Sequence, residues 1–266
     1  MSGSATAPVK AGGFQWREAL IGLILPVVIL ATWQLMFHLG YINPMKLPPP
    51  SAVAVKWVEY ASTGELFHDA WGSLYRVVMG FAIGTSLALP LGLMMGAWPM
   101  TNRLCNLTVQ VLRPIPPIAY IPMAMLWFGL GNPPALFLIS IGAFFPVLMN
   151  TIAGVRQVDG IFLRAARNLG ASQGTIFLRV ILPAATPYIF SGMRIAMGTA
   201  FIVVIVAEMI AVPDGLGFRI LEGREYFWMD KIIAGMFTIG FIGLAIDTGM
   251  SSLNNYLLRW HRGLEH

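Results

Sequence analysis

Six long apolar stretches, separated by short polar segments, dominate the pattern of this 266-residue chain. They cover approximately residues 19–40, 72–97, 108–130, 134–154, 187–211 and 231–257. A helix that crosses a bilayer needs about 20 predominantly apolar residues, and each stretch has about this length. The pattern therefore predicts an all-α membrane protein with about six transmembrane helices.

The third stretch is the least regular of the six, because it contains Pro114, Pro116, Pro117 and Pro122. Proline removes a backbone donor and kinks or ends a helix. We therefore expect a broken or late-starting helix over 108–130, with its prolines near the membrane surface or against protein.

Composition supports a membrane protein and excludes several other classes. Hydrophobic residues make up 57% of the chain and charged residues 11%, whereas soluble domains carry about 25% charged residues. The single cysteine, Cys105, excludes an intrachain disulfide, and the four histidines are too scattered to suggest a metal site. The formal charge of +5 does not require nucleic acid, because basic residues gathered on one side of a membrane give the same total.

The distribution of Lys and Arg predicts the orientation of the chain. With the amino terminus inside, eleven of the 17 basic residues fall on the inner side, five on the outer side and Arg76 within a span. This bias predicts an N-in/C-in topology in the cell inner (plasma) membrane, with membrane lipid as the surrounding partner. Residues 1–18 and 259–266 are then inner tails. Residues 41–71 form an outer, proline-rich arm with a short amphipathic helix at 52–61, and 72–258 form the core.

The polar segment 155–186 is the most distinctive part of the core. Asp159 can cap a first short helix, Gly170 can end it in a left-handed conformation, and Ser172 can cap a second. Pro183 is expected to stop that second helix. Ala165 and Ala166 permit close approach of another protein. A plain surface hairpin remains an alternative for this segment.

Several further motifs accompany this segment, and together they identify a family. They are Leu112-Arg113-Pro114-Ile115-Pro116-Pro117, Trp127-Phe128-Gly129-Leu130-Gly131, Leu182-Pro183-Ala184-Ala185, Gly192-Met193-Arg194-Ile195-Ala196, and Ala207-Glu208-Met209 followed by Gly215-Leu216-Gly217. From about Leu47 to the carboxyl terminus the chain resembles an integral-membrane permease of the nitrate/sulfonate/taurine group of ABC importers.

The resemblance implies a type I ABC importer permease (ModB/MetI-like) fold and a function that depends on partners. It implies a second copy of the chain, cytoplasmic ABC ATPase subunits and a periplasmic or lipid-anchored solute-binding protein, and no nucleic acid. The outer loop 213–230 and the arm around 46–51 are candidate contacts for the solute-binding protein. The chain has no phosphate-binding loop motif, so it cannot be the ATPase itself, and we expect no cofactor in it. ATP and Mg would be bound by the partner ATPase, and the chain is not an enzyme.

Within the family, segment 155–186 would be the cytoplasmic loop that couples the permease to the ATPase. The residues that the resemblance assigns to coupling are Arg164, Ala165, Ala166, Gly170, Ala171, Leu182 and Pro183. The chain departs from the family pattern at one of them, since Arg164 stands where the family has a glutamate. The implied cargo is a small anion such as a sulfonate, taurine or nitrate. An ATP-independent secondary carrier or channel is the alternative, although it leaves the loop without a purpose.

Arg76, Arg194, Glu208 and Asp247 fall within the predicted spans, where charges are costly and usually paired or functional. We expect Arg76 and Glu208 to form an outer pair and Arg194 and Asp247 an inner pair. Such pairs would either hold the helices together or line the translocation path.

Overall fold

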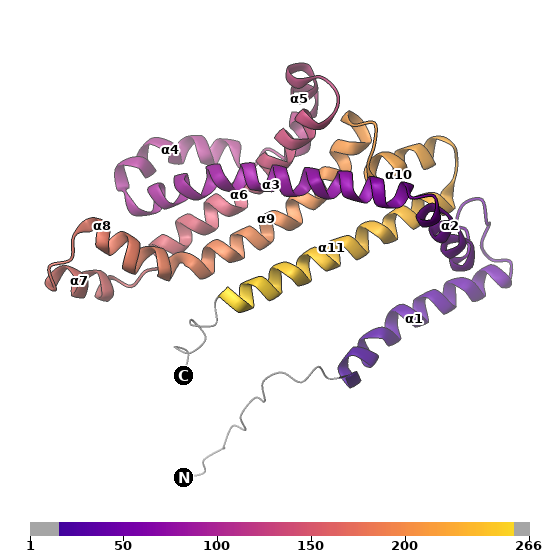
Figure 1. Ribbon diagram of the computed structural model, residues 1–266, viewed down its shortest axis with the longest axis horizontal. Coiled ribbons are helices and arrows are strands. Elements are labelled where there is room, and N and C mark those ends of the chain that lie inside the picture. The colour runs from indigo at the N-terminus through magenta and orange to yellow at the C-terminus, as the bar shows by residue number, and fades with distance from the viewer. Residues whose placement is uncertain (1–15, 258–266) are drawn as a thin grey trace, which may run out of the picture.

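The computed structural model describes residues 16–257, and every regular element in this range is helical. Figure 1 shows long helices lying side by side, with α7 and α8 at one end of the bundle and α2 and α10 toward the other. Residues 1–15 of the predicted amino-terminal tail and the predicted tail 259–266 lie outside the described residues. The prediction of an all-α membrane fold is confirmed.

Five of the described helices are long and apolar enough to span a membrane. They are α1 (Trp16–His38), α3 (Glu65–Ala97), α6 (Asn132–Arg156), α9 (Leu182–Ala211) and α11 (Met229–Leu257). The short elements are α2 (Pro50–Ser62), α4 (Pro99–Leu112), η1 (Pro117–Tyr120), α5 (Ile121–Phe128), α7 (Gly160–Asn168), α8 (Gln173–Ile176), η2 (Phe177–Ile181) and α10 (Leu216–Glu225).

The predicted span 108–130 is not one straight helix. Helix α4 ends at Leu112, and the η1–α5 segment leaves it at an angle of 84°. The break falls on Pro114, Pro116 and Pro117, where missing backbone donors prevent a continuous helix. The expectation of a broken helix is therefore confirmed, and a sixth span exists only if the bent pair is counted as one.

Helices α3, α6 and α9 form the centre of the bundle (Figure 1). Their buried residues make two main apolar clusters, which share the long face of α6. Small residues allow the close approach, as at Gly84, where an added Cβ would lie 2.4 Å from the carbonyl oxygen of Ser140. Such small-residue contacts are the usual way in which membrane helices pack.

Helices α1 and α2 lie at the edge of this bundle (Figure 1). Helix α2 packs on α11, and the indole nitrogen of Trp57 donates to the Thr238 hydroxyl at 2.9 Å. It contains the short amphipathic helix predicted at 52–61. Helix α3 begins at Glu65, seven residues before the predicted start, so it extends into the segment that the sequence assigned to the outer arm.

Candidate functional site

Helices α7 and α8 form a hairpin at one end of the bundle (Figure 1), and the sequence signals that predicted it act as expected. The Asp159 carboxylate accepts a hydrogen bond from the Ile161 amide at 2.8 Å, which caps α7. Gly170 has a φ of +77° and ends the helix, and the Ser172 hydroxyl accepts from the Thr175 amide at 3.3 Å at the start of α8. The predicted helix–Gly–helix unit is therefore confirmed.

The prediction that Pro183 stops the second helix is wrong. The helical path continues from Gln173 through Pro183 to Ala211, a length of 39 residues. Proline cannot donate to the carbonyl four residues before it. The π-turn at Phe177–Ile181 directly precedes Pro183, and such turns accommodate breaks in the regular ladder without ending the helix.

The hairpin leaves apolar side chains uncovered. Ile161 is 60% exposed, Phe162 63% and Leu169 87%, while α7 has no buried residue. The α8 side is anchored instead, because Ile176 is buried and Phe177 stacks on Trp98 with ring centroids 5.6 Å apart. The hairpin is thus anchored through α8 and presents exposed apolar side chains along α7 and at the turn after it.

The residues assigned to coupling are not all exposed on the hairpin. Arg164, Ala165 and Gly170 are exposed, whereas Ala166 and Ala171 are half-buried. Leu182 and Pro183 are half-buried at the start of α9, where Leu182 packs against the cluster of Val155, Ala185 and Ile189. The structure therefore separates Leu182 and Pro183 from the exposed part of the hairpin.

At the opposite end of the bundle, Arg76 of α3 and Glu208 of α9 are brought together. Arg76 Nη1 donates to Glu208 Oε1 at 2.7 Å, and both side chains are almost fully buried. Arg76 also donates to Asn132 Oδ1 at 2.6 Å and forms an ion pair with Asp214. Helices α3, α6 and α9 and the loop before α10 therefore meet at one guanidinium group.

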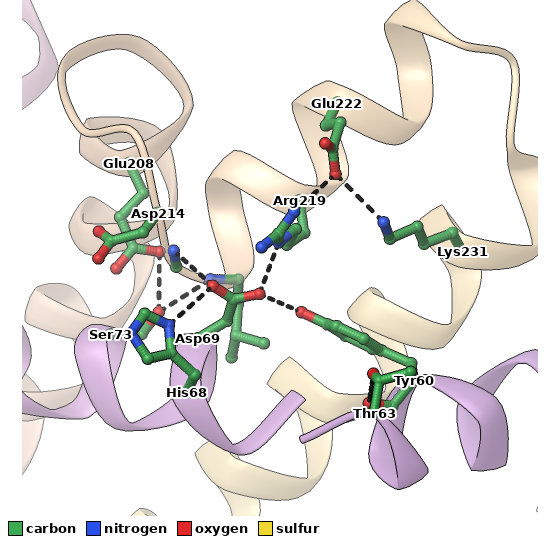
Figure 2. Close-up of polar contacts among 12 residues, drawn as sticks. Tyr60, Thr63, His68, Asp69, Ser73, Glu208, Asp214, Arg219, Glu222 and Lys231 are labelled. Atoms are coloured by element: carbon green, nitrogen blue, oxygen red, sulfur yellow. Dashed lines mark hydrogen bonds and ion pairs between the residues drawn. The ribbon is translucent and has the colours of Figure 1, made fainter. Parts of the chain in front are cut away.

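Buried side chains from α3 and α9 cap the amino terminus of α10. Figure 2 shows Asp69, Ser73 and Glu208 converging on this point. Successive backbone amides donate to them: Gly215 to Asp69 Oδ1 at 3.1 Å, Leu216 to Ser73 Oγ at 3.0 Å, and Gly217 to Glu208 Oε2 at 3.0 Å. The first amides of a helix lack intrahelical partners and favour negative charge, so the two buried carboxylates and α10 stabilise one another.

Gly215 makes this approach possible. Its φ is +104°, and an added Cβ would lie 2.5 Å from the carboxyl carbon of Glu208. Any other residue would therefore both strain the backbone and displace the carboxylate.

The network extends outward from Asp69 (Figure 2). Asp69 Oδ2 accepts from the Tyr60 hydroxyl at 2.5 Å and from Arg219 Nε at 2.7 Å. Arg219 and Lys231 both donate to Glu222 Oε2, at 3.1 and 3.2 Å. These contacts join α2, α3, α10 and α11, so we call residues 60, 69, 73, 76, 208, 214, 219, 222 and 231 the α10 network.

Three groups of the α10 network outside the spanning helices have displaced pKa values. Burial and the hydrogen bond to Asp69 raise the pKa of the Tyr60 phenol. Burial alone would raise the pKa of Glu222, but the hydrogen bonds from Arg219 and Lys231 lower it. Burial opposes the charge of Arg219, yet its carboxylate partners Asp69 and Glu222 raise the pKa of Arg219.

Arg194 and Asp247 are also brought together, in a two-pronged contact with both N–O distances at 2.8 Å. Their environment differs from that of the outer pair, since the side chains are 45% and 55% exposed. This pair lies on the surface of the single chain, between α9 and α11.

Sequence reasoning missed Asp69, Ser73, Asp214, Arg219 and Tyr60 as members of the α10 network. One signal was present, because Asp69, Ser73 and Arg76 are spaced by four and three residues and therefore share a helix face. The assignment of residues up to 71 to an outer arm concealed it.

The whole chain was compared with known proteins. Residues 88–263 match the family described as binding-protein-dependent transport system inner membrane component. The chain is 34% identical to the taurine transport system permease protein TauC of Escherichia coli, over 92% of this chain and 91% of that protein. It is 35% identical to SsuC of Bacillus subtilis, named as an aliphatic sulfonates transport permease, over 98% and 95%.

The fold also matches a solved structure, an inward-facing form of the MetNI methionine ABC transporter. The TM-score is 0.62 at 19% identity, covering 75% of this chain and 97% of that one. This likeness establishes the type I permease fold. The family match over most of the core, the relatives above 30% identity and this fold agree: the chain belongs to the binding-protein-dependent transport system inner membrane components and is a permease of the nitrate/sulfonate/taurine group of ABC importers.

Proposed function

We propose that this permease works as a pair of identical chains, driven by separate ABC ATPase subunits, and imports a small anion delivered by a solute-binding protein. The observation that carries the coupling part is the exposed apolar surface of the α7–α8 hairpin. Ile161, Phe162 and Leu169 are all more than half exposed, and α7 has no buried residue, so a partner is expected to cover this surface.

The hairpin would dock into a cytoplasmic ATPase subunit, so that the hairpin end of the bundle would lie inside the cell, as the proposed N-in/C-in orientation requires. That partner binds ATP and Mg and hydrolyses the ATP, and this chain carries out no catalysis. Closure of the ATPase pair would move the two hairpins and change the access of the permease, as a rigid-body switch biased by ATP. At the Arg164 position, the exposed guanidinium would contact the ATPase where relatives use a carboxylate.

The proposed cargo is an organic sulfonate, including taurine. Support comes from the relatives SsuC and TauC, whose names refer to aliphatic sulfonates and taurine. Nitrate remains a second candidate within the group.

The α10 network would act as a structural clamp at the outer end rather than as a binding site. Its carboxylates are all engaged by Arg, Lys or backbone amides, which favours the structural reading over one in which Glu208 binds cargo. The neighbouring loop and α10 would form the surface that meets the solute-binding protein.

The experiment that tests the coupling proposal is co-purification of the tagged permease with its ATPase, followed by uptake of a radiolabelled sulfonate into cells. Gly170→Val forces a β-branched residue into a φ of +77°, and Ala165→Asp puts a charge on the exposed side of α7. We expect both variants to lose ATPase association and uptake while reaching the membrane. Gly174→Ala is the matched control, since an added Cβ meets nothing within 4 Å there.

Wild-type association and uptake in both variants would contradict the assignment of the hairpin. Transport by the purified permease alone in liposomes, without ATPase or ATP, would contradict the whole proposal in favour of a carrier or channel.

A further inference from the structure

A cavity of about 560 Å³ lies between α4 and the ends of α3 and α6. Its polar lining consists of three amides and two guanidinium groups, from Asn102, Asn106, Gln110, Arg113 and Arg156. Arg156 Nη2 donates to Asn102 Oδ1 at 2.6 Å, so the guanidinium bridges α6 to α4 across the cavity wall. The volume lies within the range of about 300–1,000 Å³ that ligand sites occupy.

The cavity lies at the hairpin end of the bundle. Arg156 is the last residue of α6, directly before the segment that leads to α7. On the other side of the cavity, α4 follows Trp98, which stacks on Phe177 at the base of the hairpin.

A second cavity of about 390 Å³ adjoins the first, because both are lined by Arg113 and Met149. It continues along the faces of α6 and α9, where Asn150 and Thr199 supply polar groups. Arg113 therefore stands at the junction of a partly polar route that runs from the middle of the bundle toward the hairpin end.

The charge in this route is of one sign. Among residues 16–257, no Asp or Glu lines either cavity, and neither Arg113 nor Arg156 forms a salt bridge. The arginines of the spanning helices that were described above, Arg76 and Arg194, each have a carboxylate partner. Two guanidinium groups without a carboxylate, set among amide donors, suit a planar or tetrahedral oxyanion, which guanidinium binds through paired hydrogen bonds.

We propose that these two cavities form an oxyanion-binding vestibule, in which Arg113 and Arg156 hold the transported anion before it leaves toward the cytoplasm. The inference rests on the proposed import of a small anion, and it adds the site on this chain that the anion occupies. A lipid phosphate offers the same chemistry, so the test must separate a soluble oxyanion from a headgroup.

The first experiment measures the charge of the vestibule without requiring transport. Asn106→Cys is made in a Cys105→Ser background, and the assembled permease–ATPase complex is treated with two thiol reagents of similar size. One is the anionic sulfonatoethyl methanethiosulfonate and the other its cationic trimethylammonium counterpart. We expect the anionic reagent to react faster, and Arg113→Gln or Arg156→Gln to lower the ratio of the two rates by about three- to ten-fold.

Arg103→Gln is the matched control, because Arg103 lies on α4 near the introduced cysteine and is exposed, as Arg113 and Arg156 are, but does not line either cavity. An equal loss of the rate ratio in this variant would overturn the proposal, since the selectivity would then reflect general surface charge.

The second experiment tests the occupant. Millimolar methanesulfonate should slow modification of the introduced cysteine in the otherwise unchanged complex, and this protection should disappear in Arg113→Gln. Sodium chloride at the same ionic strength should give no protection. Protection that exists in phosphatidylcholine nanodiscs but is lost in phosphatidylglycerol nanodiscs would show a headgroup in the vestibule and overturn the proposal.

Uptake by the full complex with its solute-binding protein completes the test. Arg113→Gln should reduce sulfonate uptake at least several-fold with ATPase association retained, whereas Arg113→Lys should restore part of it and Arg103→Gln should leave it unchanged. Normal uptake in Arg113→Gln would overturn the vestibule. A wild-type complex that shows charge-selective modification but no anion uptake would instead refute the proposed cargo.

Discussion

Substitution of Glu208 by Gln should destabilise the permease far more than a change of one atom suggests. Glu208 is fully buried, with Oε1 accepting from Arg76 and Oε2 accepting from both Ser73 and the Gly217 amide. A glutamine replaces one of these acceptors by an NH₂ group. If that group takes the place of Oε2, it faces the amide donor of Gly217; if it takes the place of Oε1, it faces the guanidinium of Arg76.

Either orientation loses at least one buried, charge-assisted hydrogen bond, which contributes about 1.5–3 kcal/mol. The buried positive charge of Arg76 also loses one of its two carboxylate partners, although Asp214 remains beside it. Breaking a buried ion pair from one side costs about 3–5 kcal/mol, so with this residual partner we expect about 3 kcal/mol. At about 2–4 °C per kcal/mol for a chain of this size, Tm should fall by about 6–12 °C.

The assay can use the single cysteine of the chain. Cys105 packs against the second apolar cluster, so a thiol-reactive fluorogenic dye reports its exposure when the purified permease is heated. Glu59→Gln is the control, because this carboxylate is 59% exposed in an i,i+3 surface pair and such pairs contribute little. A Tm for Glu208→Gln within about 2 °C of that control would refute the claim that Glu208 holds α10 in place.

Two further predictions concern packing and pH. Gly84→Ala places a Cβ 2.4 Å from the Ser140 carbonyl oxygen and should lower the free energy of unfolding by about 1–3 kcal/mol, measured in the same thermal assay. Gly240→Ala is the control: its added Cβ meets nothing within 4 Å, so it should be neutral or stabilising. Tyr60→Phe removes the hydrogen bond to Asp69 and should cost about 1.5–3 kcal/mol at neutral pH. Because the pKa of Tyr60 is raised in the folded state, the unfolded chain ionises first, near pH 10. The stability contributed by the protonated phenol is therefore complete below that pH and declines above it. The difference in the free energy of unfolding between the wild type and Tyr60→Phe should therefore narrow above about pH 10. A difference that stays constant from pH 7 to 11 would contradict the role assigned to the Tyr60 phenol.

The sequence predicts those parts of the structure that are formed by contacts between neighbouring residues. Asp159, Gly170 and Ser172 each act within three residues of their own position, so the hairpin could be read from the sequence. The spanning helices follow from length and hydropathy alone. The proline-rich break after Leu112 was predictable as a break, but its 84° angle depends on packing between distant helices.

The α10 network depends on contacts between residues far apart in the chain. Such contacts leave no periodic pattern in a single sequence from which they could be predicted. Asp69 lies before residue 72, where the second span was predicted to begin. Its partners, the Gly215 amide and Arg219, lie 146 and 150 residues away. Arg76 and Glu208 could be paired only because charges inside spans need partners, whereas the backbone amides that complete their site carry no sequence signature.

The uninterrupted helix through Pro183 connects the two ends of the permease. Gln173 at the hairpin and Glu208 in the α10 network belong to one helical path of 39 residues, which is about 58 Å long at 1.5 Å per residue. A displacement of α8 must therefore move the Glu208 end of α9 unless the path bends. The π-turn at Phe177–Ile181 and Pro187 are the two irregular points at which it can bend. Since Glu208 caps α10 directly, motion that passes these points reaches α10 and the loop before it through a single contact. The α10 network and the hairpin are thus connected by one helical path with two possible hinge points.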